Sequence, residues 1–156
     1  MKADYMETNN AAARPDSLGR LLNFATGAMN RMCQARLAEH DLLLAQWVIL
    51  SALWARDGLH VSELARYSGN NLPAASRIVD RMVDKGLVAR SADAEDRRSV
   101  RVHLTEAGRA HEGLRDFHLE VNETLTAGMS DAETRMLFDL LGRVLENARR
   151  ADGGRA

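Results

Sequence analysis

Arginine is the side chain in this sequence best suited to chemistry, because it supplies 19 of the 21 basic residues. Its planar guanidinium fits phosphate oxygens and base edges better than the point charge of a lysine does. Arg77 and Arg81 lie four residues apart in a segment with helical spacing, and Arg97 and Arg98 adjoin each other in a polar segment. Since genome composition alone can enrich arginine, the positions of these residues matter more than their number. Arginines at these positions are suited to contacts with a polyanion.

The charge of the chain is unevenly distributed along the sequence. The formal net charge of the 156 residues is −1, which on its own argues against a nucleic-acid partner. Residues 66–101, however, hold 8 basic and 5 acidic side chains, a net charge of +3, whereas residues 1–65 carry −1 and residues 102–156 carry −3. A local positive field governs DNA binding more than the total charge does. The charge pattern therefore predicts a central third that binds DNA.

The composition indicates one compact domain of the cytoplasm. With 46% hydrophobic and 28% charged residues and 2 prolines, the chain is neither disordered nor fibrous. The single cysteine, Cys33, cannot form an intrachain disulfide, which is typical of a reducing compartment. The longest apolar runs, 42–45 and 47–50, are too short to span a membrane, and the N-terminus has no apolar signal segment. We therefore expect no membrane partner.

The central third has the spacing of a helix-turn-helix. We expect a helix over 60–68, a glycine-containing turn over 69–71 and a longer helix over 72–85. Asn71 is a natural N-cap for the longer helix, and Gly86 stands where a C-terminal glycine belongs. The inner face of the longer helix is expected to comprise Leu72, Ala75, Ile78, Val79 and Met82.

A change in the period of apolar residues, from 3.6 to 2, follows this second helix. The alternation predicts short strands over 87–90 and 100–104, with a polar, charged loop over 91–99 between them. Two strands joined by a charged loop directly after a helix-turn-helix form a wing.

Long helices with apolar patterns flank this region. One is expected over 17–39, and another over 42–54 is hydrophobic almost all round, which indicates burial on most sides. Ser130 and Glu133 have the spacing of a capping box at the start of the last helix. A further helix is expected to begin at Thr105, with a buried stripe of Leu114, Phe117, Val121 and Leu125.

The stretches KGLVAR and DRRSVRVHLTEAG are the most specific motifs of the segment 62–109. With them, this segment resembles the winged helix-turn-helix of the MarR family of bacterial transcriptional regulators, and the flanking helices match the family in number and length. The resemblance implies a mainly α fold with a small β-hairpin wing, a winged helix-turn-helix with N- and C-terminal dimerisation helices. The expected parts are a flexible arm over 1–16, a single domain over 17–150 with its core over about 44–105 and dimerisation helices over about 17–39 and 106–150, and a frayed tail over 151–156.

The helix over 72–85 is expected to enter the major groove of DNA, which is about 12 Å wide and accepts one helix. Residues near the N-terminus of such a helix reach base edges first, while contacts to phosphate set its register. An ordinary surface helix with solvated Arg–Asp pairs is the alternative. We expect base contacts from Pro73, Ala74 and Arg77, phosphate contacts from Ser76 and Arg81, and a place at the interface for Asn71.

In the wing, Asp96 and Arg98 match the Asp-x-Arg signature of the family. In the family this arginine enters the minor groove and the aspartate orients it, and a narrow minor groove concentrates negative potential. Arg90 and Arg97 are expected to contact the DNA backbone. The alternative is a solvated charged turn.

The terminal helices carry more apolar surface than one domain needs. Members of the family interleave these helices as a homodimer, so that two wings meet a palindromic site. A bundle within one chain is the alternative. The expected interface residues are Leu18, Leu21, Leu22, Phe138, Leu141 and Leu145.

Members of the family often bind small phenolic or aromatic acids between the dimer helices and the winged domain. Such a pocket is mostly apolar with one or two polar groups. Met and Trp at helical spacing are more often part of an ordinary core, which stays the alternative for each residue. The expected lining is Met29, Met32, Cys33, Trp47, Leu50 and Trp54, with His111 or Arg115 as the polar anchor.

The sequence therefore predicts a DNA-binding transcriptional repressor that a small aromatic or phenolic effector releases from a pseudo-palindromic operator. A thiol-based redox sensor using Cys33 and a dimeric scaffold that does not bind DNA are the alternatives. No phosphate-binding glycine loop or nucleophile motif is present, so we expect neither enzyme activity nor a cofactor. His111 and His118 are seven residues apart and form no metal-binding pair, so we expect no metal.

Overall fold

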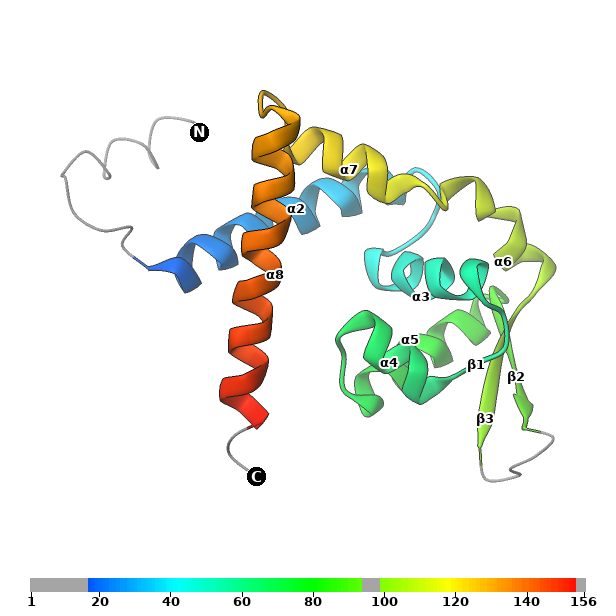
Figure 1. Cartoon of the computed structure of the whole chain (residues 1–156). Helices are drawn as coiled ribbons and strands as arrows, with labels where there is room; N and C mark the ends of the chain where they lie inside the picture. Colours follow the sequence, from blue (N-terminus) through cyan, green and yellow to red (C-terminus); the bar gives the residue numbers. More distant parts are fainter. Residues whose placement is uncertain (1–16, 94–98, 154–156) are drawn as a thin grey trace, which may run out of the picture. The chain divides into compact units, whose positions relative to one another are not determined.

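A computed structural model describes residues 17–93 and 99–153. The chain forms two compact units, with the boundary between Glu112 and Gly113. The first contains α2 (Leu18–Ala38), α3 (Leu44–Ala55), β1 (Leu59–His60), α4 (Val61–Ser68), α5 (Leu72–Asp84), β2 (Val88–Ala92), β3 (Val100–Leu104) and α6 (Glu106–Ala110) (Figure 1). A short 3-10 helix (Glu112–Leu114) precedes α7 (Phe117–Leu125) and α8 (Asp131–Gly153).

The fold is a winged helix-turn-helix, mainly helical with one small sheet, as the sequence predicts. The three strands are antiparallel in the order β1-β3-β2, and β2 and β3 extend from the helices as a hairpin (Figure 1). The predicted strand over 87–90 lies one residue later and is longer, because its pairing with β3 continues to Ala92 opposite Val100. Strand β1 was not predicted, since two residues are too few to show an alternating period.

The helix-turn-helix forms from its predicted local signals. The Asn71 side chain accepts a hydrogen bond from the Ala74 amide at 2.9 Å, and Gly86 has a φ of 72°, the left-handed conformation that glycine adopts readily. On the inner face of α5, Ala75, Val79 and Met82 are buried, whereas the prediction for Leu72 is wrong. Leu72 is 53% exposed because it begins the helix, where the chain has not yet reached the core.

Contacts of the LTEAG segment join the hairpin to α6. The Thr105 hydroxyl donates to the carbonyl of Gly86 at 2.5 Å and accepts from the amide of Gly108 at 3.2 Å. The indole of Trp54 donates to the carbonyl of Gly108 at 3.1 Å. Gly108 packs so closely that a Cβ there would collide with the carbonyl oxygen of Leu87. Only glycine permits this approach between α6 and the start of the hairpin.

The helix predicted from Thr105 is interrupted, which corrects the sequence expectation. Helix α6 ends at Ala110, and a 3-10 turn containing Gly113 separates it from α7, in keeping with the low helix propensity of glycine. Of the predicted buried stripe, Phe117 and Val121 are buried, whereas Leu125 is exposed. Leu125 is the last residue of α7, and Leu114 lies in the 3-10 turn before α7 and is half-buried, so the predicted stripe is confirmed only at Phe117 and Val121.

Helix α8 begins at the predicted capping box. The Glu133 carboxylate accepts from the amide of Ser130 at 2.7 Å, and the Glu133 amide donates to the Ser130 hydroxyl at 3.3 Å. These reciprocal bonds satisfy donors that the first helical turn leaves without partners.

Replacing Gly108 with alanine is expected to lower the free energy of unfolding by about 2 kcal/mol, because the new Cβ forces α6 away from the hairpin. Denaturant unfolding followed by circular dichroism measures the change. Gly142→Ala is the matched control, since a Cβ at Gly142 meets nothing within 4 Å and alanine favours the helix. Equal stabilities for the wild type and Gly108→Ala would contradict the close approach.

Candidate nucleic-acid interface

Helix α5 presents the predicted DNA-contacting residues on its polar face. Asn71, Pro73, Arg77 and Arg81 are exposed, and Ala74 and Ser76 are half-buried. Within the described part of the chain, neither Arg77 nor Arg81 forms an ion pair, so the alternative in which they pair with aspartates of the same helix is not observed there. Both guanidinium groups are therefore available to an anionic partner.

Arg90 of β2 ties the hairpin to α5. Its Nη1 lies 3.0 Å from Oδ1 of Asp80, and its Nη2 donates to the hydroxyl of Ser76 at 3.1 Å and to the carbonyl of Ser76 at 3.3 Å. Arg90 and Ser76, both predicted to contact the DNA backbone, thus bind each other. The ion pair also offsets the negative charge that Asp80 places on α5. The DNA contacts of these two residues stay predictions.

A buried carboxylate closes the hairpin next to its loop. The side chain of Asp93 is 4% exposed, and its Oδ2 accepts from Nε of Arg101 at 2.5 Å and lies 3.3 Å from Nε2 of His60. The hydroxyl of Ser99 lies 2.8 Å from Nδ1 of His60, and Nη1 of Arg101 donates to the carbonyl of Gly58 at 2.9 Å. Sequence reasoning missed this cluster, because an aspartate in a polar segment gives no sign of burial.

The predicted wing residues Asp96, Arg97 and Arg98 lie outside the described residues. Their assignment to the minor groove and to the DNA backbone stays a prediction.

Asp57 holds the turn after α3 against the end of β3. Its Oδ1 accepts from the amide of Leu104 at 2.8 Å, and its Oδ2 accepts from Nη2 of Arg109 at 2.9 Å. Burial acts to raise the pKa of Asp57, but hydrogen bonds from the amides of Leu104 and Gly58, together with the charge of Arg109, outweigh it. The pKa therefore lies below its ordinary value.

A carboxylate whose pKa is lower in the folded chain than in the unfolded chain stabilises the fold at neutral pH. That contribution is lost as the pH falls below about 4, through the folded pKa. Asp57→Asn is expected to lower the free energy of unfolding at pH 7 by about 1 kcal/mol. As the pH falls, the free energy of unfolding of this variant is expected to decrease less steeply than that of the wild type. Urea unfolding between pH 7 and pH 3 measures both effects, with Asp139→Asn on α8 as the control. Parallel acid profiles for the wild type and Asp57→Asn would contradict this role.

Several of the residues predicted to line an effector pocket lie in the core. Cys33, Leu50 and Trp54 are buried, Met29, Met32, Trp47 and His111 are half-buried, and Arg115 is exposed and belongs to the second unit. Their role in effector binding stays a prediction.

The environment of Cys33 does not favour redox sensing. The residue is 3% exposed, and burial raises the pKa of its thiol more than the nearby Arg36 lowers it. At neutral pH the thiol is therefore protonated, whereas the thiolate is the reactive form.

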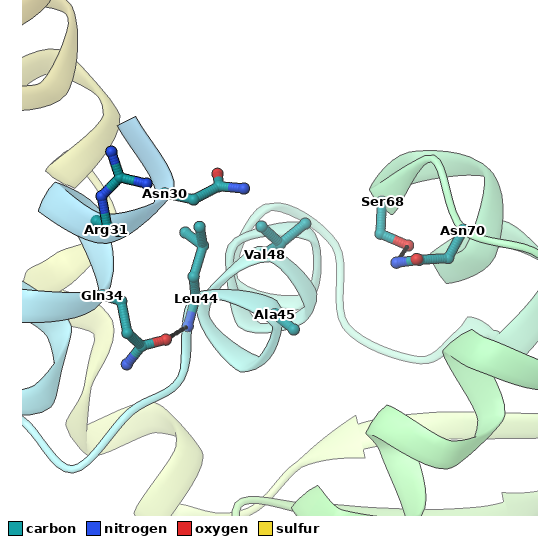
Figure 2. Close-up of a pocket in the computed structure, with 8 residues that line it drawn as sticks. All are labelled: Asn30, Arg31, Gln34, Leu44, Ala45, Val48, Ser68 and Asn70. Carbon is teal, nitrogen blue, oxygen red and sulfur yellow. Dashed lines mark hydrogen bonds between the residues drawn. The ribbon is translucent and has the colours of Figure 1, made fainter. Parts of the chain in front are cut away.

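An open pocket of about 570 Å³ lies between α2, α3 and the turn after α4. In Figure 2, Leu44 and Val48 of α3 stand between the polar side chains of α2 and those of Ser68 and Asn70. Gln34 closes one end, since its amide oxygen accepts from the amide of Leu44 at 3.0 Å. The lining residues are Asn30, Arg31, Gln34, Leu44, Ala45, Val48, Ser68 and Asn70.

The predicted dimer residues are mostly exposed in the single chain. Leu18 and Leu21 on α2 are exposed and Leu22 is half-buried. On α8, Phe138, Leu141 and Leu145 are all exposed. Apolar groups of this number on two long helices are typical of an interaction surface.

None of the helices in 17–93 and 99–153 is both long enough and apolar enough to cross a membrane. Within the same residues, no group of three His, Cys, Asp or Glu side chains is arranged to hold a metal ion.

Comparison with known proteins points to one family. A family model described as the MarR family matches residues 42–100. The multiple antibiotic resistance protein MarR of Escherichia coli is 32% identical over 134 residues, which are 82% of this chain and 90% of that protein. The HTH-type transcriptional regulator TtmR of Methylorubrum extorquens is also 32% identical, over 81% of this chain and 67% of that protein.

A solved structure of Bordetella bronchiseptica BpsR has a similar fold. It superposes with a TM-score of 0.72 at 26% identity and covers 81% of this chain and 97% of that one. The structure concerns the mechanism by which 6-hydroxynicotinic acid regulates DNA binding by BpsR.

Proposed function

The chain belongs to the MarR family, and from that membership we propose that it is a DNA-binding transcriptional repressor acting in the cytoplasm. The observation that carries the proposal is the placement of α5. Its Arg77 and Arg81 form no ion pair with any described residue and face outward beside a hairpin that Arg90 fixes to the same helix. A helix and a wing held in one rigid arrangement suit simultaneous contacts to a major groove and the neighbouring minor groove. The regulation of DNA binding described for BpsR supports the proposal.

The proposed regulator acts as a homodimer on a pseudo-palindromic operator. The exposed apolar residues of α2 and α8 support this, because burying each leucine or phenylalanine against a second copy releases about 1.5–3 kcal/mol. Two recognition helices related by a two-fold axis match two half-sites about one helical turn apart.

Replacing Arg77 with alanine is expected to weaken operator binding about 10- to 100-fold and to relax sequence preference, because base-edge contacts are lost. Arg81→Ala is expected to weaken binding to all sequences alike and to reduce the salt slope by about one unit. Fluorescence anisotropy with duplexes that the wild type selects from a random pool measures both effects.

The control variant for this experiment is Arg149→Ala on α8, which removes the same charge away from α5. A wild type that selects no sequence and binds duplexes without salt dependence would favour the DNA-independent scaffold instead.

The proposed effector is a small aromatic carboxylic acid bound in the pocket between α2 and α3. Leu44, Ala45 and Val48 offer an apolar wall for a ring, and Asn30 with Arg31 supplies donors suited to a carboxylate. Within the described residues, Arg31 forms no ion pair, so its guanidinium needs no partner displaced before it binds an anion. The pocket volume lies in the range of small-molecule sites.

The pocket is tested with two carboxylates, benzoate and 6-hydroxynicotinate, and with the neutral analogue benzamide. We expect the carboxylates to raise the melting temperature and benzamide to do so much less, because only an anion pairs with Arg31. Arg31→Gln is expected to weaken carboxylate binding about tenfold, and Arg20→Gln on the same helix is the control. Equal responses to benzoate in the wild type and Arg31→Gln would rule out this pocket.

A further inference from the structure

The two ends of the hairpin loop meet on a single side chain, His60. The neck of the hairpin is the pair Asp93 and Ser99, whose backbones are joined by a hydrogen bond of 3.0 Å from the Asp93 amide to the Ser99 carbonyl. One ring nitrogen of His60 lies 3.3 Å from the Asp93 carboxylate, and the other lies 2.8 Å from the Ser99 hydroxyl. The residue after β2 and the residue before β3 thus each contribute one contact to the same imidazole.

The chemistry of an imidazole suits this double contact. A neutral ring protonated at Nε2 donates to Asp93 while Nδ1 accepts from the hydroxyl of Ser99. A charged ring donates on both sides, because the hydroxyl turns to accept. Both contacts therefore persist in either state of the ring. The buried carboxylate of Asp93 is stabilised because His60 adds a second partner to Arg101.

His60 itself belongs to the helix-turn-helix and not to the hairpin. It ends β1 and is the N-cap residue of α4, and its amide donates to the Glu63 carboxylate at 2.9 Å. Strand β1 pairs with β3 at Leu59 and His60, opposite Val102 and Arg101, whereas β2 and β3 stay paired as far as Ala92 and Val100. Beyond Arg101 the described hairpin is therefore two-stranded, and a two-stranded hairpin is only marginally stable without further contacts. Arg90 fixes the hairpin to α5, whereas His60 fixes the neck to the start of α4.

We propose that His60 is a positioning residue for the wing, because it fixes the neck from which the connection carrying Asp96, Arg97 and Arg98 departs. The inference rests on the proposed function, since the position of these arginines affects binding only if the chain binds DNA. His60 acts through the neck and makes no DNA contact in this role. In general, a chain segment whose two ends are fixed has fewer conformations, so it loses less conformational entropy when it binds.

A double-mutant cycle with Arg98 tests this role. With Arg98 present, His60→Phe is expected to weaken operator binding about tenfold, because both contacts to the neck are lost. In the Arg98→Ala background, His60→Phe is expected to weaken operator binding less than about twofold, since the side chain to be positioned is gone. His60→Gln, whose amide both donates and accepts, is expected to restore most of the affinity. If His60→Phe weakened operator binding by the same factor with Arg98 present and with Arg98→Ala, the inference would be overturned.

Amide hydrogen exchange provides a second readout that needs no DNA. Exchange at the Asp93 amide is expected to speed up about tenfold in His60→Phe and to return toward the wild-type rate in His60→Gln. His103→Phe is the control, because His103 lies on β3 near Asp57 and does not contact the neck. Unchanged exchange in His60→Phe would overturn the inference, whatever the protein binds. A wild type that binds no duplex would overturn the proposed function, and with it the role at DNA, while the exchange data still decide whether His60 holds the neck.

Discussion

The arrangement of the first unit depends on α3, a helix that is apolar on nearly every side and is covered by other elements on most of them. Ile49, Leu50 and Leu53 are almost fully buried, and each such side chain stabilises the fold by about 1.5–3 kcal/mol when it is removed from water. Helices α2, α4 and α5 and strand β3 all pack against α3. Because α5 turns its apolar residues toward this shared centre, its arginines face outward. The position of α5 is therefore a consequence of covering α3.

Polar contacts then fix the angle between α5 and the hairpin, which apolar packing alone leaves adjustable. Hydrophobic contact fixes that α5 and the hairpin adjoin, but not their relative angle, because it has little directionality. Arg90 and His60 supply directional bonds at two places on the hairpin, one against α5 and one at the neck. These internal bonds divide the basic residues of the interface into two groups. Arg90 and Arg101 hold the structure together, whereas Arg77 and Arg81 stay available to a partner.

Local signals in the sequence predicted most of the fold, and contacts between distant residues account for what was missed. The cap at Asn71 and the turn at Gly86 depend on neighbouring residues alone, so spacing sufficed to locate them. His60 and Ser99 are 39 residues apart, and no periodicity indicates that they meet. The pocket illustrates a further limit. Periodicity identifies Leu50 as apolar and inward-facing, but only packing distinguishes a core residue from one that lines a cavity, as Val48 does.

One loop connects the proposed effector pocket with α5. Gln34 of the pocket wall donates to the carbonyl of Leu42 at 3.1 Å and accepts from the amide of Leu44, so it holds both sides of the α2–α3 corner. In the same corner, Asp41 binds Lys85 at the end of α5, with Nζ 3.0 Å from the carboxylate. A ligand that moves Gln34 therefore acts on a loop to which α5 is tied. Such a ligand shifts DNA binding only by the difference between its affinities for the two arrangements of this corner. Under the proposed function, an effector thus releases DNA only if it binds more tightly to the arrangement in which α5 is displaced.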